Sequence, residues 1–212
     1  MRLTTRTTIV IGFLIVVTWY CSYFGSIAVG TPPVAYDVIL DTGSADLFLV
    51  SSSCTSQTCS GVQTFSGSSS STFNSTTTPF TITYGSGSAA GVLGRDVIQM
   101  AGFQVSQQTF GMSFSITCPL HGPLTIFSAL VDQLTDGLVS SPVSGILGLG
   151  WQALASSGAT PFWQSLYEGN AWDEPLMGFY LTRFQNASRG SSQEPGGVFT
   201  MGLSTVSPPR IS

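Results

Sequence analysis

The chain has 212 residues and a mass of 22.3 kDa, enough for one ordinary domain or one large lobe. Only 8% of its residues are charged, with no Lys at all, whereas a soluble domain usually carries roughly 25%. A net charge of −4 without a basic cluster excludes a nucleic-acid phosphate binder, and 42% hydrophobic residues exclude a disordered chain. The composition is typical of an all-β extracellular protein rich in Ser, Thr and Gly.

Residues 1–22 form a signal-like or anchor-like apolar segment. Arg2 and Arg6 precede the apolar run from Ile9 to Tyr20, which matches the basic and apolar regions of a signal peptide. The run is short for a membrane span, but the absence of charge between Arg6 and Asp37 leaves an uncleaved anchor as the alternative. We expect a secreted, extracellular protein, with membrane attachment only if this segment is retained.

From Tyr23 onward the apolar pattern has a period of two, which predicts short strands separated by turns. The predicted strands are Tyr23–Val29, Val34–Leu40, Leu47–Val50, Phe80–Tyr84, Val97–Met100, Phe103–Val105, Phe179–Phe184 and Val198–Met201. The low-complexity stretch 66–78 is expected to be a solvated surface connection. Strands at this density favour an antiparallel sandwich or a barrel-like lobe.

One short amphipathic helix is predicted near the middle of the second half of the chain. Thr160 would be its N-cap and Pro161 its first residue. Phe162 and Leu166 lie four residues apart and therefore on one face, and Gly169 would end the helix.

Two of the four cysteines, Cys54 and Cys59, have a spacing that allows a short local bridge in a polar loop. A zinc site is the weaker interpretation of this pair, because no His lies nearby and His121 is the single one in the chain. We expect no metal and no cofactor. A disulfide would require an oxidising compartment, in which the sequons at Asn74 and Asn186 permit glycosylation.

The most informative stretch is Asp41-Thr42-Gly43-Ser44, which follows the apolar residues Val38-Ile39-Leu40. The pattern places a carboxyl group at the end of a buried strand, before a tight turn. Two adjacent carboxyl groups can share one proton and divide the roles of acid and base, and the aspartic proteases are the best-known example. The same triplet also occurs in ordinary capped turns, so that the motif alone leaves a structural role open.

Further motifs extend this pattern in a fixed order. Tyr23–Pro33, Asp41–Leu47, Thr83–Ser88 and Ser144–Gly150 together resemble the amino-terminal lobe of the pepsin-like aspartic proteases, most of all the secreted fungal type. The resemblance covers about residues 23–112 and 132–202. It implies an all-β pepsin-like acid protease lobe, one of the two lobes of a bilobal fold. The implied activity is that of an aspartic endopeptidase acting on peptide or protein substrates, without a cofactor and without nucleic acid.

The resemblance also implies roles for individual residues. Asp41 would be one of the two Asp residues that activate water, and Ser44 would form a hydrogen bond to its carboxylate. Thr42 would brace the active-site loop through its hydroxyl, and Gly43 would offer a backbone carbonyl to the substrate.

A flap and a disulfide loop are implied in the same way. Tyr84, Gly85 and Ser86 would form a mobile hairpin over the bound peptide, and Cys54 and Cys59 would close the small disulfide loop of the lobe. The alternative for Tyr84 is an aromatic strand residue that faces the core. At position 48 the chain departs from the family, because it has Phe where the family usually has a Trp that donates to the flap tyrosine, and Phe has no donor for this hydrogen bond.

The chain departs from the family by lacking a second Asp-Thr-Gly or Asp-Ser-Gly. We therefore expect a partial chain, or a mis-spliced product, that carries one catalytic Asp and is inactive alone. The lobe would span residues 23–202, with an insertion at 113–131 and a divergent tail at 203–212. The alternative function is a non-catalytic peptide- or protein-binding module on the same scaffold. A monomer is expected, and self-assembly of two such lobes is a weaker hypothesis.

Overall fold

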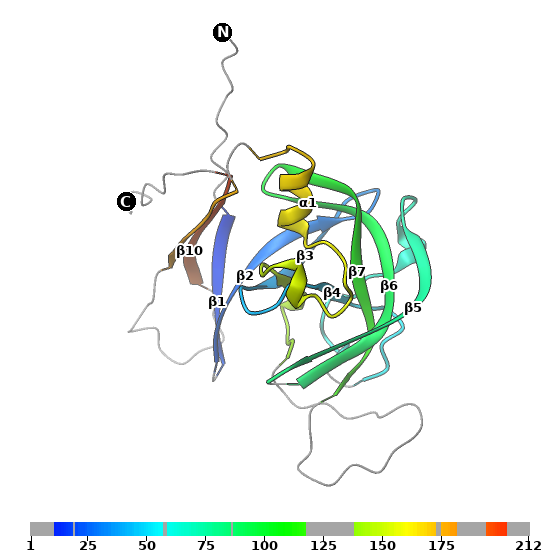
Figure 1. Cartoon of the computed structure of the whole chain (residues 1–212). Helices are drawn as coiled ribbons and strands as arrows, with labels where there is room; N and C mark the ends of the chain where they lie inside the picture. The colour runs from blue at the N-terminus through cyan, green and yellow to red at the C-terminus, as the bar shows by residue number, and fades with distance from the viewer. Residues whose placement is uncertain are drawn as a thin grey trace.

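The computed structural model describes residues 11–18, 20–56, 59–85, 87–117, 138–172, 175–181 and 194–202 (Figure 1). Within them the chain is mainly β-structure, which confirms the predicted fold class. The strands are β1 (Ile11–Thr18), β2 (Tyr20–Val29), β3 (Val34–Asp41), β4 (Leu47–Val50), β5 (Asn74–Tyr84), β6 (Gly87–Met100), β7 (Phe103–Thr117), β8 (Val143–Gly148), β9 (Met177–Leu181) and β10 (Glu194–Met201). The helix α1 spans Phe162–Glu168, and two short 3₁₀ helices span Gly67–Ser69 and Gln152–Leu154.

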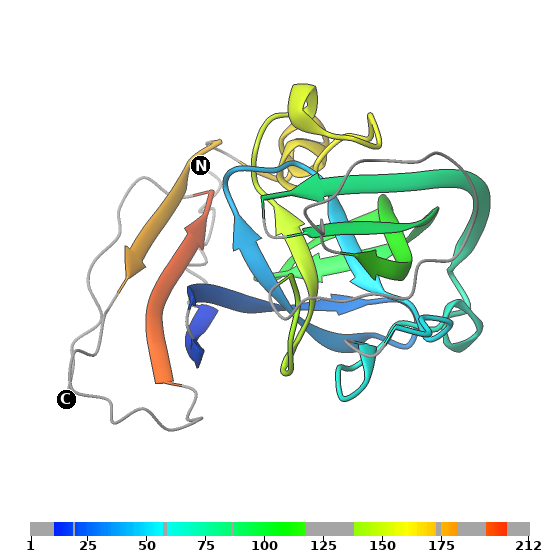
Figure 2. The same ribbon diagram turned by 90° about the horizontal axis from the view of Figure 1, so that it is seen from below.

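All these strands belong to one sheet, in the order β5-β6-β7-β4-β8-β3-β2-β1-β10-β9. β6 also pairs with β2, so that the strands between them in this order close into a barrel. β1, β10 and β9 continue the sheet away from the barrel and form a wing on its side (Figures 1 and 2). The expectation of a barrel-like lobe is therefore confirmed.

Two of the strand pairings are parallel, whereas most are antiparallel. β8 lies between β3 and β4 and runs parallel to β3, and β4 runs parallel to β7. Parallel neighbours need a crossover connection, and β8 follows β3 only after a long stretch of chain. The position of β8 between β3 and β4 brings Asp41, the last residue of β3, beside Gly148 at the end of β8.

Apolar side chains pack on both sides of the barrel wall. One cluster gathers Ile27, Val38, Leu49 and Phe110 and is covered by α1, whose Phe162, Trp163 and Leu166 are buried. The other cluster gathers apolar side chains from β2, β4, β5, β6 and β8, and Tyr84 packs against it; its members include Phe24, Phe48, Phe80, Ile82 and Ile146. The alternation of side chains along each strand allows one wall to serve both clusters.

The predicted strands are present, but several are longer than their apolar pattern indicates. β6 starts at Gly87 and β7 runs to Thr117, because backbone pairing between these two strands continues through stretches rich in Gly, Ala and Ser. β9 covers the first part of the strand predicted at Phe179–Phe184, and residues 182–184 lie outside the described residues. The helix is also confirmed, although Pro161 rather than Thr160 is its N-cap residue and Gly169 its C-cap.

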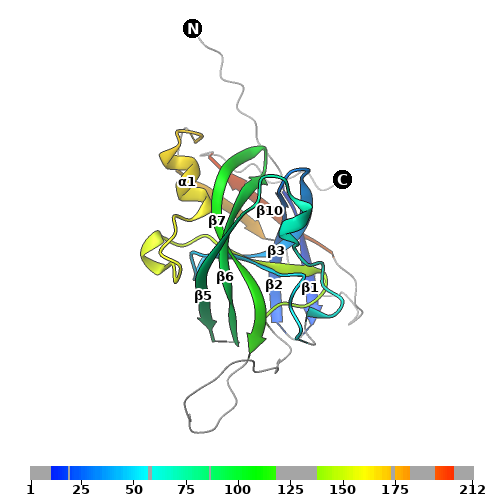
Figure 3. The ribbon, with the colours of Figure 1, turned by 90° about the vertical axis from the view of Figure 1, so that its right-hand side faces the viewer.

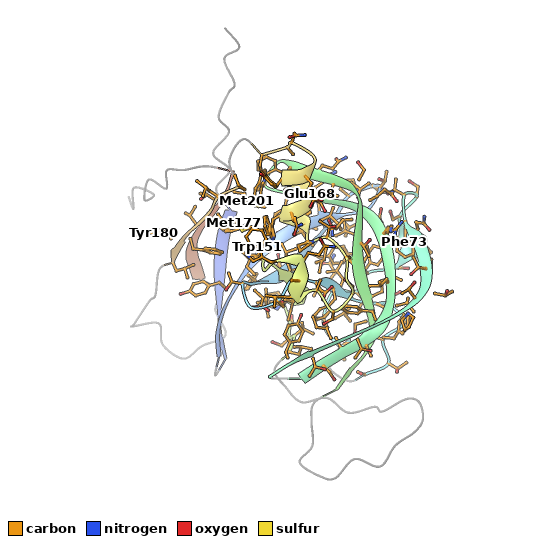
Figure 4. All side chains as sticks on the ribbon, viewed as in Figure 1. Phe73, Trp151, Glu168, Met177, Tyr180 and Met201 are labelled. Atoms are coloured by element: carbon orange, nitrogen blue, oxygen red, sulfur yellow. A yellow bond between two sulfur atoms is a disulfide. The ribbon has the colours of Figure 1, made fainter. Side chains whose placement is uncertain are left out.

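The stretch 66–78 is not simply a solvated connection, and this prediction needs correction. It contains a short 3₁₀ helix and the first residues of β5. Phe73, which Figure 4 shows on the side of β5 and β6, packs edge-on against Phe65 with ring centroids 5.4 Å apart. The hydroxyl of Thr72 donates to the buried carboxylate of Asp96 at 2.6 Å. These contacts anchor a stretch whose composition alone indicates a loop.

The proposed domain boundaries stay predictions. Within residues 1–22, the structure describes β1, which pairs with β2 and β10. β7 extends into the proposed insertion 113–131 as far as Thr117, and the rest of that insertion and the tail 203–212 lie outside the described residues. Among the described residues, no helix has the length and apolar character needed to span a membrane.

Candidate active site

Asp41 is the last residue of β3, which is only partly buried, rather than fully buried as the sequence pattern indicated. Val38, which precedes it in β3, is fully buried, and the Asp41 side chain is half-buried at the strand end. The backbone N–H of Gly43 donates to Oδ1 of Asp41 at 2.9 Å, and the hydroxyl of Ser44 donates to Oδ2 at 2.6 Å. Two donors from the following turn therefore fix the orientation of this carboxylate.

The turn that follows Asp41 is fastened to the segment after β8. The N–H of Leu149 donates to the carbonyl of Asp41 at 2.7 Å, and the N–H of Gly150 donates to the carbonyl of Ser44 at 2.7 Å. A Cβ atom at Gly148 would lie 2.4 Å from the backbone of Ala45, so the close approach of the two segments requires glycine there. The apolar-apolar-Gly pattern of Ser144–Gly150 is thus explained by backbone packing.

One face of this turn is open to solvent. Thr42 and Gly43 are exposed, whereas Ser44 is only 7% exposed. The hydroxyl of Thr42 makes no hydrogen bond to other residues that the structure describes. Its bracing role, which the resemblance implies, would need a partner that approaches this open face.

Asp46 is a functional candidate that the sequence reasoning missed. Its carboxylate is 5% exposed and accepts hydrogen bonds from the N–H of Ser156 at 2.6 Å, the N–H of Ser157 at 3.3 Å and the hydroxyl of Ser157. The N–H of Gly148 also donates to the carbonyl of Asp46 at 2.9 Å. Asp46 therefore joins the Asp41 turn to a loop that is distant in the sequence. The single sequence signal for the burial of its side chain is its position directly before the apolar strand β4.

The hairpin between β5 and β6 carries the proposed flap residues. Tyr84 pairs with Gly87, so the link between β5 and β6 has the length that is typical of a tight hairpin. Gly85 is exposed, and Ser86 lies outside the described residues. Tyr84 is half-buried and packs against the buried Phe48, with ring centroids 6.3 Å apart. Tyr84 thus combines a place beside the turn with contact to the core.

The hydroxyl of Tyr84 is buried without a hydrogen-bond partner among the described residues. Burial raises the pKa of this phenol, and the negative charges of Asp41 and Asp46 act in the same direction. Ser44 acts in the opposite direction, although its hydroxyl does not reach Tyr84 in hydrogen-bonding geometry. Phe48, which occupies the position next to the ring, has no donor to offer.

The two remaining site residues, Cys54 and Cys59, form a disulfide, as the resemblance implied. Cys59 is buried in the cluster that also contains Phe48, so the bridge fixes its loop to the core beneath Tyr84. Within the described ranges, no group of three or more His, Cys, Asp or Glu residues is arranged to hold a metal ion.

Comparison with known proteins gives the same picture over most of the chain. The family model of the eukaryotic aspartyl proteases matches residues 22–200. Major aspartyl peptidase 1 of Cryptococcus neoformans is 42% identical over 87% of this chain, and Aspartic protease 1 of Caenorhabditis elegans is 37% identical over 85%. Pepsin A of Suncus murinus is 39% identical over 83%. The chain spans only 34%, 42% and 41% of the lengths of these three relatives. The chain belongs to the eukaryotic aspartyl protease family.

Proposed function

We propose that the chain is the amino-terminal lobe of an aspartic endopeptidase, in which Asp41 and a second Asp from another lobe activate water. The observation that carries this proposal is the Asp41 carboxylate, oriented by Gly43 and Ser44 at an open face of the barrel. A second carboxyl that approaches this face would lie beside Asp41, where the two could share a proton. Thr42, exposed on the same face, would then meet the second lobe.

Each side chain has a defined task in this proposal. Asp41 or its partner, when ionised, accepts a proton from the water, and the protonated carboxyl donates to the carbonyl oxygen of the peptide bond. Ser44 and the backbone of Gly43 keep the Asp41 carboxylate in one orientation during this exchange. Tyr84 pairs with Gly87 at the end of the β5–β6 hairpin, and Tyr84, Gly85 and Ser86 would be the flap that covers an extended peptide.

The location proposed for the protein follows from two features of the chain. The apolar segment 1–22 would direct it to the secretory pathway, and the disulfide between Cys54 and Cys59 fits an oxidising compartment. We propose a secreted glycoprotein whose substrates are peptides or proteins and which, as the 212-residue chain, is a monomer.

The test compares the chain alone with a hybrid in which it is joined to the remaining part of the Cryptococcus relative. At about pH 3 to 4, where a carboxyl pair is half ionised, the chain alone should not cleave an unfolded protein substrate, whereas the hybrid should do so in a pepstatin-sensitive manner. Asp41→Asn in the hybrid should abolish cleavage. A hybrid that retains full activity with Asp41→Asn would overturn the role proposed for this residue.

A binding module without catalysis is the second candidate, and the unpartnered hydroxyl of Tyr84 favours it, since a flap that is not held in place supports turnover poorly. Under this alternative the chain alone would bind peptides tightly, without cleavage, and Asp41→Ala would leave the affinity unchanged. Isothermal titration with an apolar peptide distinguishes the two functions, because the active-site proposal expects Asp41→Ala to weaken binding.

A further inference from the structure

Asn74 belongs to the sequon Asn74-Ser75-Thr76 and is the first residue of β5. Its side chain is exposed, and the amide makes no hydrogen bond to other described residues. The neighbouring Thr76 hydroxyl, by contrast, donates to the carbonyl of Leu93. The amide nitrogen of Asn74 is therefore free to carry a substituent that projects into solvent.

β5 forms one edge of the sheet. Among the described strands it pairs with β6 on one side only, and Figure 3 shows it as the outer strand of the curved β5–β6–β7 layer. An unpaired strand edge is a template for association with other chains, and proteins usually protect such edges with Lys or other charged side chains. β5 has Pro79 and an irregular register between Ser75 and Pro79, but it contains no charged residue.

A polar row crosses the sheet from Asn74. Asn74 is directly opposite Arg95 in β6, and Arg95 is opposite Thr109 in β7, so the three side chains share one face. The Nε–H of Arg95 donates to the Thr109 hydroxyl at 3.2 Å. Both residues line a hollow of about 450 Å³, whose other walls include Gln107 and Gln152. Amide, hydroxyl and guanidinium groups are suited to hydrogen bonds with sugar hydroxyls.

We infer that Asn74 carries an N-linked glycan whose first sugars lie over the row Asn74–Arg95–Thr109 and whose further sugars screen the open edge of β5 on the other side of Asn74. The inference rests on the secretory location proposed above. In the transfer, Asn74 Nδ2 forms a bond to the anomeric carbon of a lipid-diphosphate-linked oligosaccharide. The bond from that carbon to the diphosphate oxygen breaks, the lipid diphosphate leaves, and the amide gives up one proton to a base.

The chain is expressed in a yeast host in two forms, one with its own amino terminus and one directed to secretion by a heterologous signal sequence. The secreted form is analysed by peptide mass spectrometry before and after treatment with peptide:N-glycosidase, which converts a glycosylated Asn to Asp. We expect conversion at Asn74. Asn74→Gln should lose the corresponding mass, Thr76→Ser should retain it because the sequon persists, and Asn186→Gln should leave the Asn74 peptide unchanged.

The outcomes separate the steps of the argument. An unmodified Asn74 in the secreted form would overturn the inference, whereas failure of the chain with its own amino terminus to enter the pathway would overturn only the secretory proposal. Static light scattering then tests whether the glycan protects the edge of β5 from association: Asn74→Gln should aggregate faster than Asn186→Gln at equal concentration. Equal aggregation of these two variants, with Asn74 glycosylated in the parent, would overturn the protective role.

Discussion

At the scale of single residues, the Tyr84 hydroxyl stands out in the candidate site because it lacks a hydrogen-bond partner among the described residues. It is buried beside Phe48, which has no donor, and no other described side chain bonds it. A buried hydroxyl without a partner costs about 1–3 kcal/mol of stability. The chain therefore holds a polar group at the proposed flap where a phenyl ring would be tolerated better.

The first prediction concerns Tyr84→Phe, which removes this hydroxyl and keeps the ring against Phe48. We expect unchanged or higher stability at neutral pH, by up to about 3 kcal/mol, because no hydrogen bond is lost and the cost of the unpartnered hydroxyl is removed. Urea unfolding followed by fluorescence measures the change, and Tyr167→Phe, at an exposed position, is the matched control. A clear loss of stability in Tyr84→Phe alone would show that the hydroxyl has a partner.

The second prediction concerns alkaline pH. Burial raises the pKa of Tyr84, and burial also raises that of Tyr36. The folded state therefore holds these two phenol protons more tightly than the unfolded state. Their contribution to the free energy of unfolding is fully present below about pH 10 and is lost as the pH rises further. Tyr84→Phe should reduce the slope of this fall between pH 10 and 11, while Tyr36 keeps its share. An identical slope in parent and variant, from urea unfolding at several pH values, would contradict the assignment.

At the scale of elements, the Asp41 turn depends on two segments that lie far away in the sequence. The segment after β8 supplies the N–H groups of Leu149 and Gly150, and the loop around Ser156 and Ser157 is held by Asp46. The turn is therefore as stable as these attachments, and the one made by the Asp46 carboxylate can be removed by a single substitution.

The third prediction is that Asp46→Ala destabilises the chain by about 3 kcal/mol, since it removes a buried acceptor and leaves the N–H groups of Ser156 and Ser157 unpaired. Asp46→Asn, which keeps one acceptor oxygen, should lose less. Amide hydrogen exchange at Ser156 and Ser157 should become faster in Asp46→Ala before global unfolding. Unchanged exchange at both amides would contradict the role of Asp46 as an anchor.

The fourth prediction tests the packing of β8 between its neighbours. A Cβ atom at Gly145 would lie 2.0 Å from the carbonyl oxygen of Phe48 in β4, whereas one at Gly85 meets nothing within 4 Å. Gly145→Ala should destabilise the chain by more than about 4 kcal/mol or prevent folding, and Gly85→Ala should have little effect. Circular dichroism and thermal unfolding of the two variants decide the matter, and similar melting curves would contradict the geometry.

Sequence reasoning succeeded where the information is local. The hydrogen bond from Ser44 to Asp41, which the resemblance implied, spans three residues, and the alternation in Val34–Leu40 marks β3 directly. The contacts that it missed join distant positions: Asp46 with Ser157, and β6 with β2. Such contacts depend on how distant parts of the chain come together through loops and crossover connections. The periodic pattern of apolar residues in a single stretch does not indicate them.

At the scale of the whole molecule, the scarcity of charge has a consequence for acid conditions. Once carboxylates are protonated, six Arg and one His remain as the charged side chains of the chain, so that self-repulsion stays small. Burial also raises the pKa of Asp37, a shift that the hydrogen bond from Ser26 partly offsets. Ionised Asp37 therefore opposes folding, and its protonation on acidification adds stability.

The fifth prediction is that the chain tolerates acid and that salt hardly changes this. Thermal midpoints by circular dichroism at about pH 3 should shift little between low and high salt, since few charges repel one another. Asp37→Asn should raise stability at pH 7, and the difference from the parent should shrink as the pH falls through the raised pKa of Asp37 and vanish below its ordinary value of 3.8. Ser26→Ala, which removes the offsetting hydrogen bond, should lower stability at pH 7 instead. A large stabilisation by salt at pH 3, or a difference for Asp37→Asn that grows on acidification, would contradict this account of an acid-tolerant lobe.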